Sequence, residues 1–353
     1  MYRVAFIGCG GIARAHAGGY ARVPECRMIA AADVSPEALA AFGEQFGIEQ
    51  RFADYDQMLA DVRPDIVSIC TWPPLHPAPA IAAARAGVKG IVCEKPMALN
   101  LALADQMNAA AKASGTVLIV GHQRRFAPRY AQARRLIADG AIGEVEEILN
   151  ICGGDLLSDG THAVDLMRFL AGDRPVEWVF GQIDLRPPNV GNTERVGYQQ
   201  WNQTGTRYGH PIEGGSMAQL QFAGGPRGLL ETGFAARPLG YQRVRVLGSE
   251  GRFEISGDPA RDRPEFLRVW TRGSAEWRDI DLPPGHDFEA EIRALLDSIE
   301  HGTPHLLSGE SGRANLEVLL AIMESALRHE RVTLPLAVQD HPLMRDQPGE
   351  TRS

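Results

Sequence analysis

The chain has 353 residues, of which 44% are hydrophobic and 23% are charged. This length predicts two hydrophobic cores, and the composition is that of an ordinary globular protein, which excludes a disordered chain. The net charge of -8 argues against a nucleic-acid partner, because phosphate binding needs clustered Lys and Arg. No apolar run reaches the length of a membrane-spanning helix, so no membrane partner is expected.

The chain opens with an apolar run, residues 4–7, that predicts a buried strand and leads into a glycine-rich turn. The turn reads Gly8-x-Gly10-x-x-Ala13, the pattern that a dinucleotide pyrophosphate requires. Gly8 permits the tight turn, Gly10 lets the backbone approach phosphate, and the small Ala13 lets the next helix pack closely. The start of that helix also presents unpaired N–H groups to the anion.

A second strand, predicted over Arg27–Ala32, ends at Asp33. A carboxylate at this position can accept hydrogen bonds from both ribose hydroxyls of adenosine, and it would repel a 2′-phosphate. The pattern therefore favours NAD over NADP. The alternative is that Asp33 only caps the turn before residues 35–37.

Strands and Ala-rich helices alternate up to about Gly121, with later strands at 66–70, 88–93 and 116–120. Such alternation predicts βαβ units and a parallel sheet. After a helix at about 128–139, successive strands predict a second, largely antiparallel sheet. We expect a doubly wound α/β Rossmann domain over residues 1–121, an α+β domain over residues 122–336, and a tail over residues 337–353.

One helix, predicted at about 160–170, interrupts the second region, and two amphipathic helices follow near 288–300 and 309–329. A polar stretch over 186–214 contains Tyr198, Trp201 and Tyr208, and it predicts either a carbohydrate-facing loop or a subunit contact.

The five cysteines are odd in number and show no Cys-x-x-Cys spacing. We interpret them as reduced thiols in apolar surroundings. Since the chain also begins directly with strand and glycine turn, without an apolar export segment, a cytoplasmic protein is expected.

The tripeptide Glu94-Lys95-Pro96 follows a predicted strand at 90–93. In a doubly wound sheet it lies at the carboxyl edge, where ligands bind. A partly buried lysine beside a nicotinamide can hold a substrate hydroxyl, so Lys95 is a functional candidate. The alternative is a surface lysine paired with Glu94.

Several short motifs run in order along nearly the whole chain: Gly8-Cys9-Gly10-Gly11-Ile12-Ala13, Thr71-Trp72-Pro73-Pro74-Leu75-His76, Glu94-Lys95-Pro96, Gly121-His122-Gln123-Arg124-Arg125-Phe126, Gly160-Thr161-His162-Ala163-Val164-Asp165 and Val246-Leu247-Gly248-Ser249-Glu250-Gly251. This ordered set resembles the glucose-fructose oxidoreductase, inositol dehydrogenase and rhizopine-catabolism (Gfo/Idh/MocA) family of NAD(P)-dependent sugar and polyol oxidoreductases. The resemblance implies hydride transfer from a secondary hydroxyl carbon of a sugar, inositol or related polyol to NAD. It also implies that the second domain, residues 122–336, has an open, mainly antiparallel sheet and serves substrate binding and oligomerisation.

The resemblance also implies roles for single residues. Lys95 would bind the reacting oxygen, and His162 would take its proton as general base. Asp165, which shares a helix face with His162, would orient the substrate or the helix, unless it is a structural partner of Arg168. Without the resemblance, His162 would more often be a satisfied core histidine.

One position departs from the family pattern. Many members have a catalytic Asp four residues before the histidine, where this chain has Ser158. Asp159, one position later, would replace that Asp only if the turn is rotated or shifted. Ser158 can hydrogen-bond a sugar but cannot act as a base at neutral pH.

The remaining predicted contacts follow by position in the family. The predicted cofactor-binding residues are Gly8, Gly10, Gly11, Ile12, Ala13, Asp33, Thr71, Trp72, His76, Glu94, Lys95 and Gln123. The predicted substrate-binding residues are Lys95, Arg124, Ser158, Asp159, His162, Asp165, Trp201 and Tyr208. For His76 the alternative is a histidine that caps a turn.

Two further classes of function stay open from the sequence. An enzyme of this fold can retain NAD and use transient oxidation for glycoside cleavage or epimerisation, and a non-catalytic protein can bind the dinucleotide alone. No metal site is expected, because His162 and Asp165 have no further ligand cluster around them. The expected partners are a small carbohydrate or polyol and further copies of the chain, as a homodimer or homotetramer.

Overall fold

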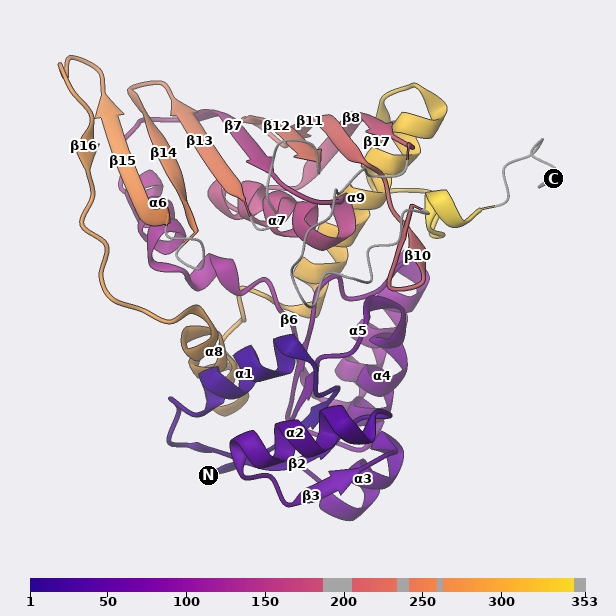
Figure 1. Ribbon diagram of the computed structural model, residues 1–353. Coiled ribbons are helices and arrows are strands. Elements are labelled where there is room, and N and C mark those ends of the chain that lie inside the picture. The colour runs from indigo at the N-terminus through magenta and orange to yellow at the C-terminus, as the bar shows by residue number, and fades with distance from the viewer. Residues whose placement is uncertain (187–204, 234–240, 259–262, 346–353) are drawn as a thin grey trace. The chain divides into compact units, whose positions relative to one another are not determined.

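The computed structural model describes residues 1–353 except 187–204, 234–240, 259–262 and 346–353 (Figure 1). The chain forms two units, residues 1–127 with 284–314, and residues 128–283 with 315–353. This division differs from the predicted one, because residues 284–314 return to the first unit although the sequence assigned them to the second domain.

The first unit is built on a six-stranded parallel sheet in the order β3-β2-β1-β4-β5-β6. Its strands are β1 (Tyr2–Ile7), β2 (Cys26–Ala32), β3 (Gln50–Phe52), β4 (Ile66–Ile69), β5 (Gly90–Cys93) and β6 (Val117–Val120). Every residue of β4 and β5 is buried, as expected for a parallel sheet covered on both faces. The strand order reverses between β1 and β4, which is where doubly wound sheets bind ligands. The predicted Rossmann fold is confirmed.

Helices connect these strands. They are α1 (Gly11–Tyr20), α2 (Pro36–Phe46), α3 (Tyr55–Val62), α4 (Pro77–Arg85), α5 (Leu101–Ser114) and the returning α8 (Asp287–His301), with short 3₁₀ turns η1 (Pro73–Leu75) and η2 (Gln123–Phe126). Helix α8 packs on α1 because Gly19 leaves room for it: a Cβ at Gly19 would lie 2.8 Å from the Cβ of Phe288. Ile292 and Leu295 of α8 are buried in the same core as Phe6 of β1.

The second unit contains a nine-stranded sheet in the order β16-β15-β14-β13-β7-β12-β11-β8-β17. Its strands are β7 (Val145–Cys152), β8 (Val176–Asp184), β11 (Gly215–Phe222), β12 (Arg227–Gly233), β13 (Gln242–Gly248), β14 (Gly251–Asp258), β15 (Arg263–Thr271), β16 (Arg278–Asp279) and β17 (Val332–Thr333). Neighbouring strands are antiparallel except for β7 and β12. The predicted second sheet, open and mainly antiparallel, is confirmed.

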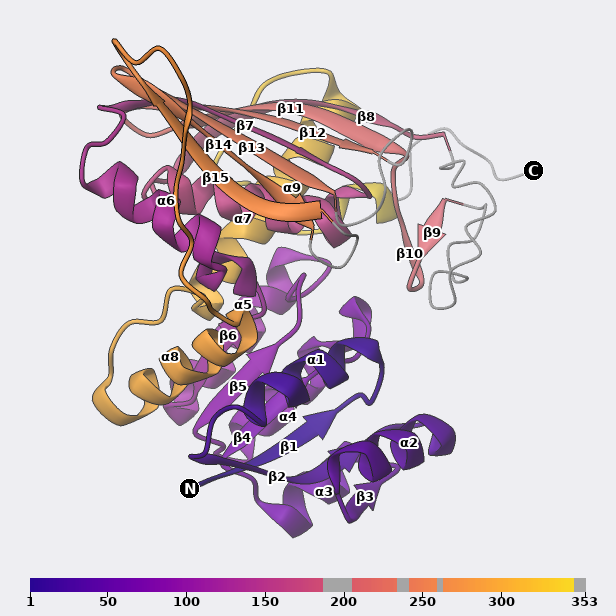
Figure 2. The ribbon, with the colours of Figure 1, turned by 60° about the vertical axis from the view of Figure 1, so that its left-hand side comes forward.

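Helices cover one face of this sheet, as Figures 1 and 2 show for α6 (Pro128–Ala138), α7 (Thr161–Leu170) and α9 (Gly309–Arg328). Leu220, Phe222 and Leu230 are buried on that side. The strands alternate, so the opposite face carries exposed apolar side chains, among them Met217 and Leu247.

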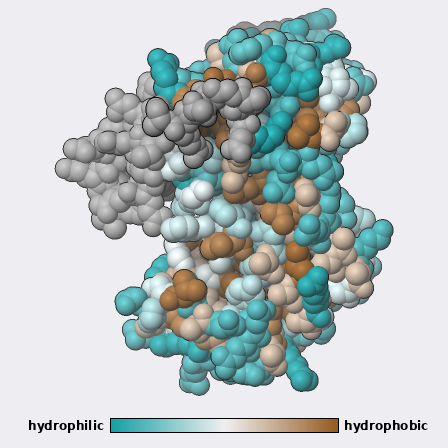
Figure 3. Space-filling model, turned by 90° about the vertical axis from the view of Figure 1, so that its right-hand side faces the viewer, coloured by the Kyte–Doolittle hydropathy of each residue, from teal (hydrophilic) through white to brown (hydrophobic). Residues whose placement is uncertain are grey.

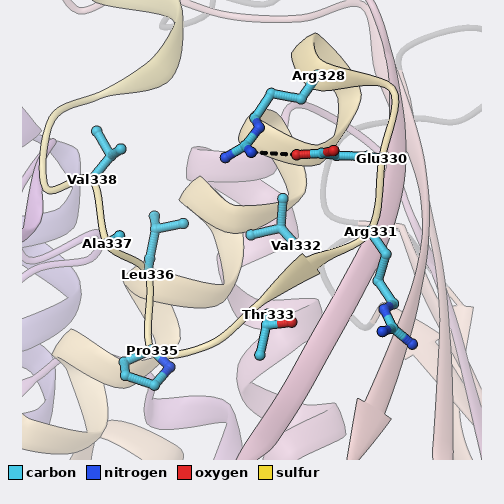
Figure 4. A pocket seen from close by; sticks show the side chains of 9 residues that line it. All are labelled: Arg328, Glu330, Arg331, Val332, Thr333, Pro335, Leu336, Ala337 and Val338. Carbon is cyan, nitrogen blue, oxygen red and sulfur yellow. Dashed lines mark ion pairs between the residues drawn. The ribbon is translucent and has the colours of Figure 1, made fainter.

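At the β17 edge of the sheet lies a small cavity of about 270 Å³, shown in Figure 4. Arg328 and Glu330 form an ion pair beside it, while Arg331 extends away from that pair and lies 5.4 Å from the ring centre of Trp178. These contacts fix the chain as it leaves α9 and enters β17.

On the face drawn in Figure 3 the described residues are mostly hydrophilic, with hydrophobic residues scattered among them. Among the described helices, none has the length and apolar character needed to span a bilayer.

Candidate active site

The glycine turn after β1 has the geometry that the sequence predicted. Gly8 has φ of 92°, and a Cβ there would lie 2.7 Å from the carbonyl carbon and oxygen of Cys70. Gly10 and Gly11 are exposed, and a Cβ on either would meet nothing within 4 Å. Helix α1 begins at Gly11 without a side-chain cap. Its first N–H groups are therefore available to an anion, while Ala13 is buried and Ile12 half-buried behind them.

A cavity of about 300 Å³ lies at the carboxyl ends of β1 to β4. Its apolar wall includes Val34, Tyr55 and Leu75, and Asp33 lies at its side. One carboxylate oxygen of Asp33 accepts the Cys9 N–H at 2.7 Å, and the other accepts the Ser35 N–H at 2.8 Å. Asp33 thus braces the glycine turn and the next helix, and each oxygen keeps a lone pair for a ribose hydroxyl.

The turn after β4 adds polar and aromatic groups to this edge. The Thr71 hydroxyl oxygen is buried without a hydrogen-bond partner, and Trp72 is 47% exposed. His76 is fully buried, with Nδ1 2.9 Å from the Pro96 carbonyl and Nε2 3.0 Å from the Thr71 carbonyl. Because burial lowers the pKa of His76, its neutral ring donates to one of these carbonyls. This placement favours the alternative in which His76 holds the turns.

The turn η2 after β6 carries Gln123 and Arg124, both half-buried. The Gln123 side-chain oxygen is buried without a hydrogen-bond partner, like the Thr71 hydroxyl. Two such orphaned polar atoms at the ligand-binding edge, together with the open glycine turn and the Asp33 cavity, fit a bound dinucleotide.

Lys95 follows β5 and is half-buried, and the Lys95–Pro96 peptide bond is cis. Glu94 lies buried beneath it. One Glu94 oxygen is 2.9 Å from His16 Nε2, and the other accepts the Lys95 N–H at 3.2 Å. Burial alone would raise the pKa of Glu94, but the hydrogen bond with His16 and the charge of Lys95 hold it below its ordinary value. The network continues from His16 Nδ1 to the Ser68 hydroxyl at 3.4 Å. Glu94 therefore fixes the backbone at Lys95.

A second buried carboxyl group, Glu291 of α8, lies near this network, and both of its oxygens lack hydrogen-bond partners. Burial, and next the charge of Glu94, raise the pKa of Glu291 well above its ordinary value. The folded protein therefore keeps Glu291 protonated at pH values where the unfolded chain ionises it. As pH rises toward and through the raised pKa, the folded state loses stability relative to the unfolded chain. We therefore expect Glu291→Met to raise the free energy of unfolding by about 1–3 kcal/mol, more at pH 8.5 than at pH 6.

Thermal unfolding at both pH values measures the Glu291 effect. Glu289→Met, on the same helix and in an exposed ion pair with Arg293, is the control and should change stability by less than about 0.5 kcal/mol. A destabilised Glu291→Met protein would show that the carboxyl group makes favourable contacts.

In the second unit, a π-helical turn, η3 (Leu156–Gly160), runs directly into α7. The Asp155 carboxylate accepts the Ser158 N–H at 2.9 Å and so caps the turn. The Gly160 N–H reaches the Asp155 carbonyl at 2.9 Å, which adds one residue to the turn relative to an α-helix. Ser158 is buried, whereas Asp159 is half-buried and its carboxylate lies over the α-carbon of Gly154.

Helix α7 carries His162 and Asp165, both buried. Side-chain amides hold its first turn: Asn150 donates to the Ala163 carbonyl at 3.1 Å, and Asn315 donates to the carbonyl and hydroxyl oxygens of Thr161 at 3.0 Å. The start of α7 is therefore fixed on both sides.

Next to the π-turn, a short hairpin of β9 (Thr206–Arg207) and β10 (His210–Pro211) places Arg207 against Asp155, with Nη1 2.9 Å from the carboxylate. Tyr208 is half-buried, its ring centre 4.9 Å from the Arg207 guanidinium. Tyr198 and Trp201 lie outside the described residues.

The sequence reading missed Asp155 and Glu213. Asp155 has a recognisable signal, since an Asp directly before the first residue of a helical segment is a typical N-cap. Glu213, which accepts the Leu156 N–H at 2.6 Å, stands alone in an irregular segment and gives no such signal.

Comparison with known proteins gives a consistent result. The NAD-binding Rossmann-fold model of an oxidoreductase family matches residues 2–122, and the model of its C-terminal alpha/beta domain matches residues 150–334. Inositol 2-dehydrogenase of Rhizobium meliloti is 29% identical, with 94% of this chain and 99% of that protein covered. Levoglucosan dehydrogenase of Pseudarthrobacter phenanthrenivorans is also 29% identical, with 94% and 98% covered.

Among solved structures, aldose-aldose oxidoreductase from Caulobacter crescentus, complexed with glycerol, aligns with a TM-score of 0.79 and 26% identity. The alignment covers 94% of this chain and 99% of that one. With both family models matched in order, over a fold and a set of motifs that agree with them, the chain belongs to the Gfo/Idh/MocA family of oxidoreductases.

Proposed function

We propose that the protein is an NAD-dependent dehydrogenase that oxidises a secondary hydroxyl group of a sugar, inositol or related polyol. The observation that carries the proposal is the half-buried Lys95 at the end of β5, braced by Glu94, at the edge where the Asp33 cavity opens. A protein that only binds a dinucleotide needs no such cation. The names of the relatives, dehydrogenases of inositol and levoglucosan, support this substrate class.

NAD bound in the first unit would accept a hydride from the carbinol carbon. His162 takes the hydroxyl proton as general base, and Lys95 stabilises the negative charge that develops on the oxygen. Asp165 orients the substrate or the helix. Ser158, Asp159, Arg124, Trp201 and Tyr208 bind the sugar, and Asp159 serves in the proton transfer in place of the family's usual Asp.

The proposed cofactor contacts divide by element. The glycine turn (Gly8, Gly10, Gly11, Ile12 and Ala13) holds the pyrophosphate, and Asp33 holds the adenosine ribose. The turns after β4, β5 and β6 complete the site with Thr71, Trp72, Glu94, Lys95 and Gln123, and His76 serves the site by holding the turns after β4 and β5.

We expect Asp33→Asn to shift cofactor preference toward NADP. The carboxylate repels a 2′-phosphate, and removing its charge should lower the ratio of kcat/KM for NAD over NADP by roughly 10- to 100-fold. Steady-state rates with each cofactor measure this ratio. Glu37→Gln, an exposed carboxylate at the start of α2, is the control and should leave it unchanged. An unchanged ratio in Asp33→Asn would assign the residue to turn capping alone.

The decisive experiment follows NADH absorbance when purified protein meets NAD or NADP with inositols, aldoses, anhydrosugars and sugar acids. A signal with NAD that His162→Ala abolishes supports the proposal. Tight NAD binding without net reduction by any compound would reject a simple dehydrogenase. Chromatographic analysis of the same reactions would then separate a glycoside hydrolase or epimerase that retains NAD from a non-catalytic binder.

We further propose a cytoplasmic homodimer or homotetramer. The cysteines, none of which forms a disulfide with another, support a reducing compartment. The exposed Met217 and Leu247 on the uncovered face of the second sheet support association through that face. Light scattering measures the assembly, and a monomer at micromolar concentration would reject it.

A further inference from the structure

A buried cluster of ionisable side chains surrounds the π-turn in the second unit. Asp155 and Glu213 are both fully buried, and Arg207 and His210 of the adjacent hairpin are buried with them. None of these four residues is required by the proposed proton or hydride transfer. Their contacts instead converge on η3, the turn that carries Ser158 and Asp159 and leads into α7.

Glu213 holds the first residue of this turn. Its Oε1 accepts the Leu156 N–H at 2.6 Å, and its Oε2 is buried without a hydrogen-bond partner. A buried N–H without an acceptor is unfavourable, so Glu213 stabilises this conformation of the turn. A charge on Glu213 would be unfavourable too, because the Asp155 carboxylate lies nearby and water does not reach either group.

Arg207 holds the other side of the turn. Its guanidinium bonds the Asp155 carboxylate, whose second oxygen accepts the Ser158 N–H. The negative charge of Asp159 also acts on Arg207. Arg207 therefore offsets the charge of Asp155, the cap of the turn, and also interacts with the charge of Asp159 within the turn.

We propose that Arg207 and Glu213 form a clamp that positions the π-turn for the reaction, and that Glu213 acts in it as an uncharged carboxylic acid. The inference rests on the proposed function. It gives a role to residues 205–213, the described end of the polar stretch over 186–214. Arg207 and Glu213 are positioning residues: they act on Ser158, Asp159 and His162 through the backbone of the turn.

The uncharged state predicts a pH dependence. Burial, and next the charge of Asp155, raise the pKa of Glu213 to about 8. His210 on the hairpin and His341 beyond it have pKa values lowered by burial, so both are neutral at pH 8, and Arg207 keeps its charge. As pH rises through about 8, Glu213 loses its proton and places a second negative charge beside Asp155. The clamp therefore weakens on the alkaline side.

Two substitutions test the clamp. Glu213→Gln keeps an oxygen for the Leu156 N–H and cannot ionise, whereas Glu213→Ala removes the acceptor. We expect Glu213→Ala to lower kcat by about 10- to 100-fold, with the NADH dissociation constant unchanged, and Glu213→Gln to restore kcat to within about threefold at pH 7. The ratio of kcat in Glu213→Gln to kcat in the wild type should rise between pH 7 and pH 9.

Glu317→Ala is the matched control, because Glu317 is also buried and accepts a backbone N–H, that of Leu336, at 2.8 Å. It should lower the melting temperature without changing kcat. A flat pH ratio for Glu213→Gln would reject the uncharged state, and wild-type kcat in Glu213→Ala would reject the clamp.

Thermal unfolding separates failure of the clamp from failure of the proposed function. Between pH 5 and pH 9 the wild type should lose stability relative to Glu213→Gln as the carboxyl group ionises, whether or not any sugar is oxidised. If the wild type shows this difference but turns over no polyol, the uncharged state of Glu213 is supported and the proposed dehydrogenase function is rejected. Parallel stability curves would reject the uncharged Glu213.

Discussion

Lys95→Met is expected to lower kcat for polyol oxidation by about 10²- to 10³-fold, the usual effect of removing a donor that stabilises a developing oxyanion. Lys95 is half-buried, and the Glu94 carboxylate fixes its backbone N–H, so the ammonium group begins from a restricted position. The substitution removes the charge and keeps much of the apolar volume. NADH binding, measured by fluorescence titration, should change less than about threefold, because the glycine turn and Asp33 supply most of the proposed cofactor contacts.

The chain offers a matched control at the other end of β5. Lys89 precedes that strand and is exposed, and its Nζ lies 2.9 Å from the half-buried Asp65 carboxylate. Lys89→Met should change kcat less than twofold and stability by less than about 1 kcal/mol. Lys95→Arg should restore only part of the activity, since a planar guanidinium does not replace a compact ammonium group. A Lys95→Met enzyme with wild-type kcat would remove Lys95 from the mechanism.

Gly8→Ala should damage both the fold of the first unit and its cofactor binding. The new methyl group would lie 2.7 Å from the Cys70 carbonyl carbon and oxygen, and φ of 92° is strained for alanine. Backbone strain and overpacking together predict a loss of roughly 2–6 kcal/mol of stability. Because any relief must move the turn away from β4, NADH affinity should fall by at least about 100-fold.

Gly10→Ala separates the two effects. Gly10 has φ of -77°, and a Cβ there meets nothing within 4 Å, so the variant should unfold within about 1 kcal/mol of the wild type. Its methyl group would instead occupy the space through which a pyrophosphate approaches, and NADH binding should weaken. Equal melting temperatures for Gly8→Ala and the wild type would contradict the predicted clash with Cys70.

The sequence predicts the first sheet well because its signals are local. The glycine turn, the apolar strands and the Ala-rich helices each require particular residues in a short window, and the structure has them where they are expected. The assignment of α8 is different. Its apolar stripe predicts a helix that packs on a core, but the space over Gly19 and Gly90, far away in the chain, determines which core.

The second unit shows a related limit. The sequence predicts a helix containing His162 and Asp165, and α7 has both. The sequence shows only that Asp159 would need a rotated or shifted turn before that helix. The structure has a π-turn there, closed by the Gly160 N–H on the Asp155 carbonyl, and this turn sets how Ser158 and Asp159 are presented. Glu213 escapes sequence analysis because its role depends on a contact 57 residues away along the chain.

The position of β7 has a consequence for how the protein folds during synthesis. This strand lies between β12 and β13, and its contacts with them join residues 80 and 92 positions apart in the chain. The centre of the second sheet therefore cannot assemble until β13 has left the ribosome, and the first unit still waits for α8 at that time. The nascent chain has to carry β7 uncovered until β13 emerges and the α8-binding surface uncovered until α8 emerges, so chaperones that bind exposed apolar segments would meet it at these two places.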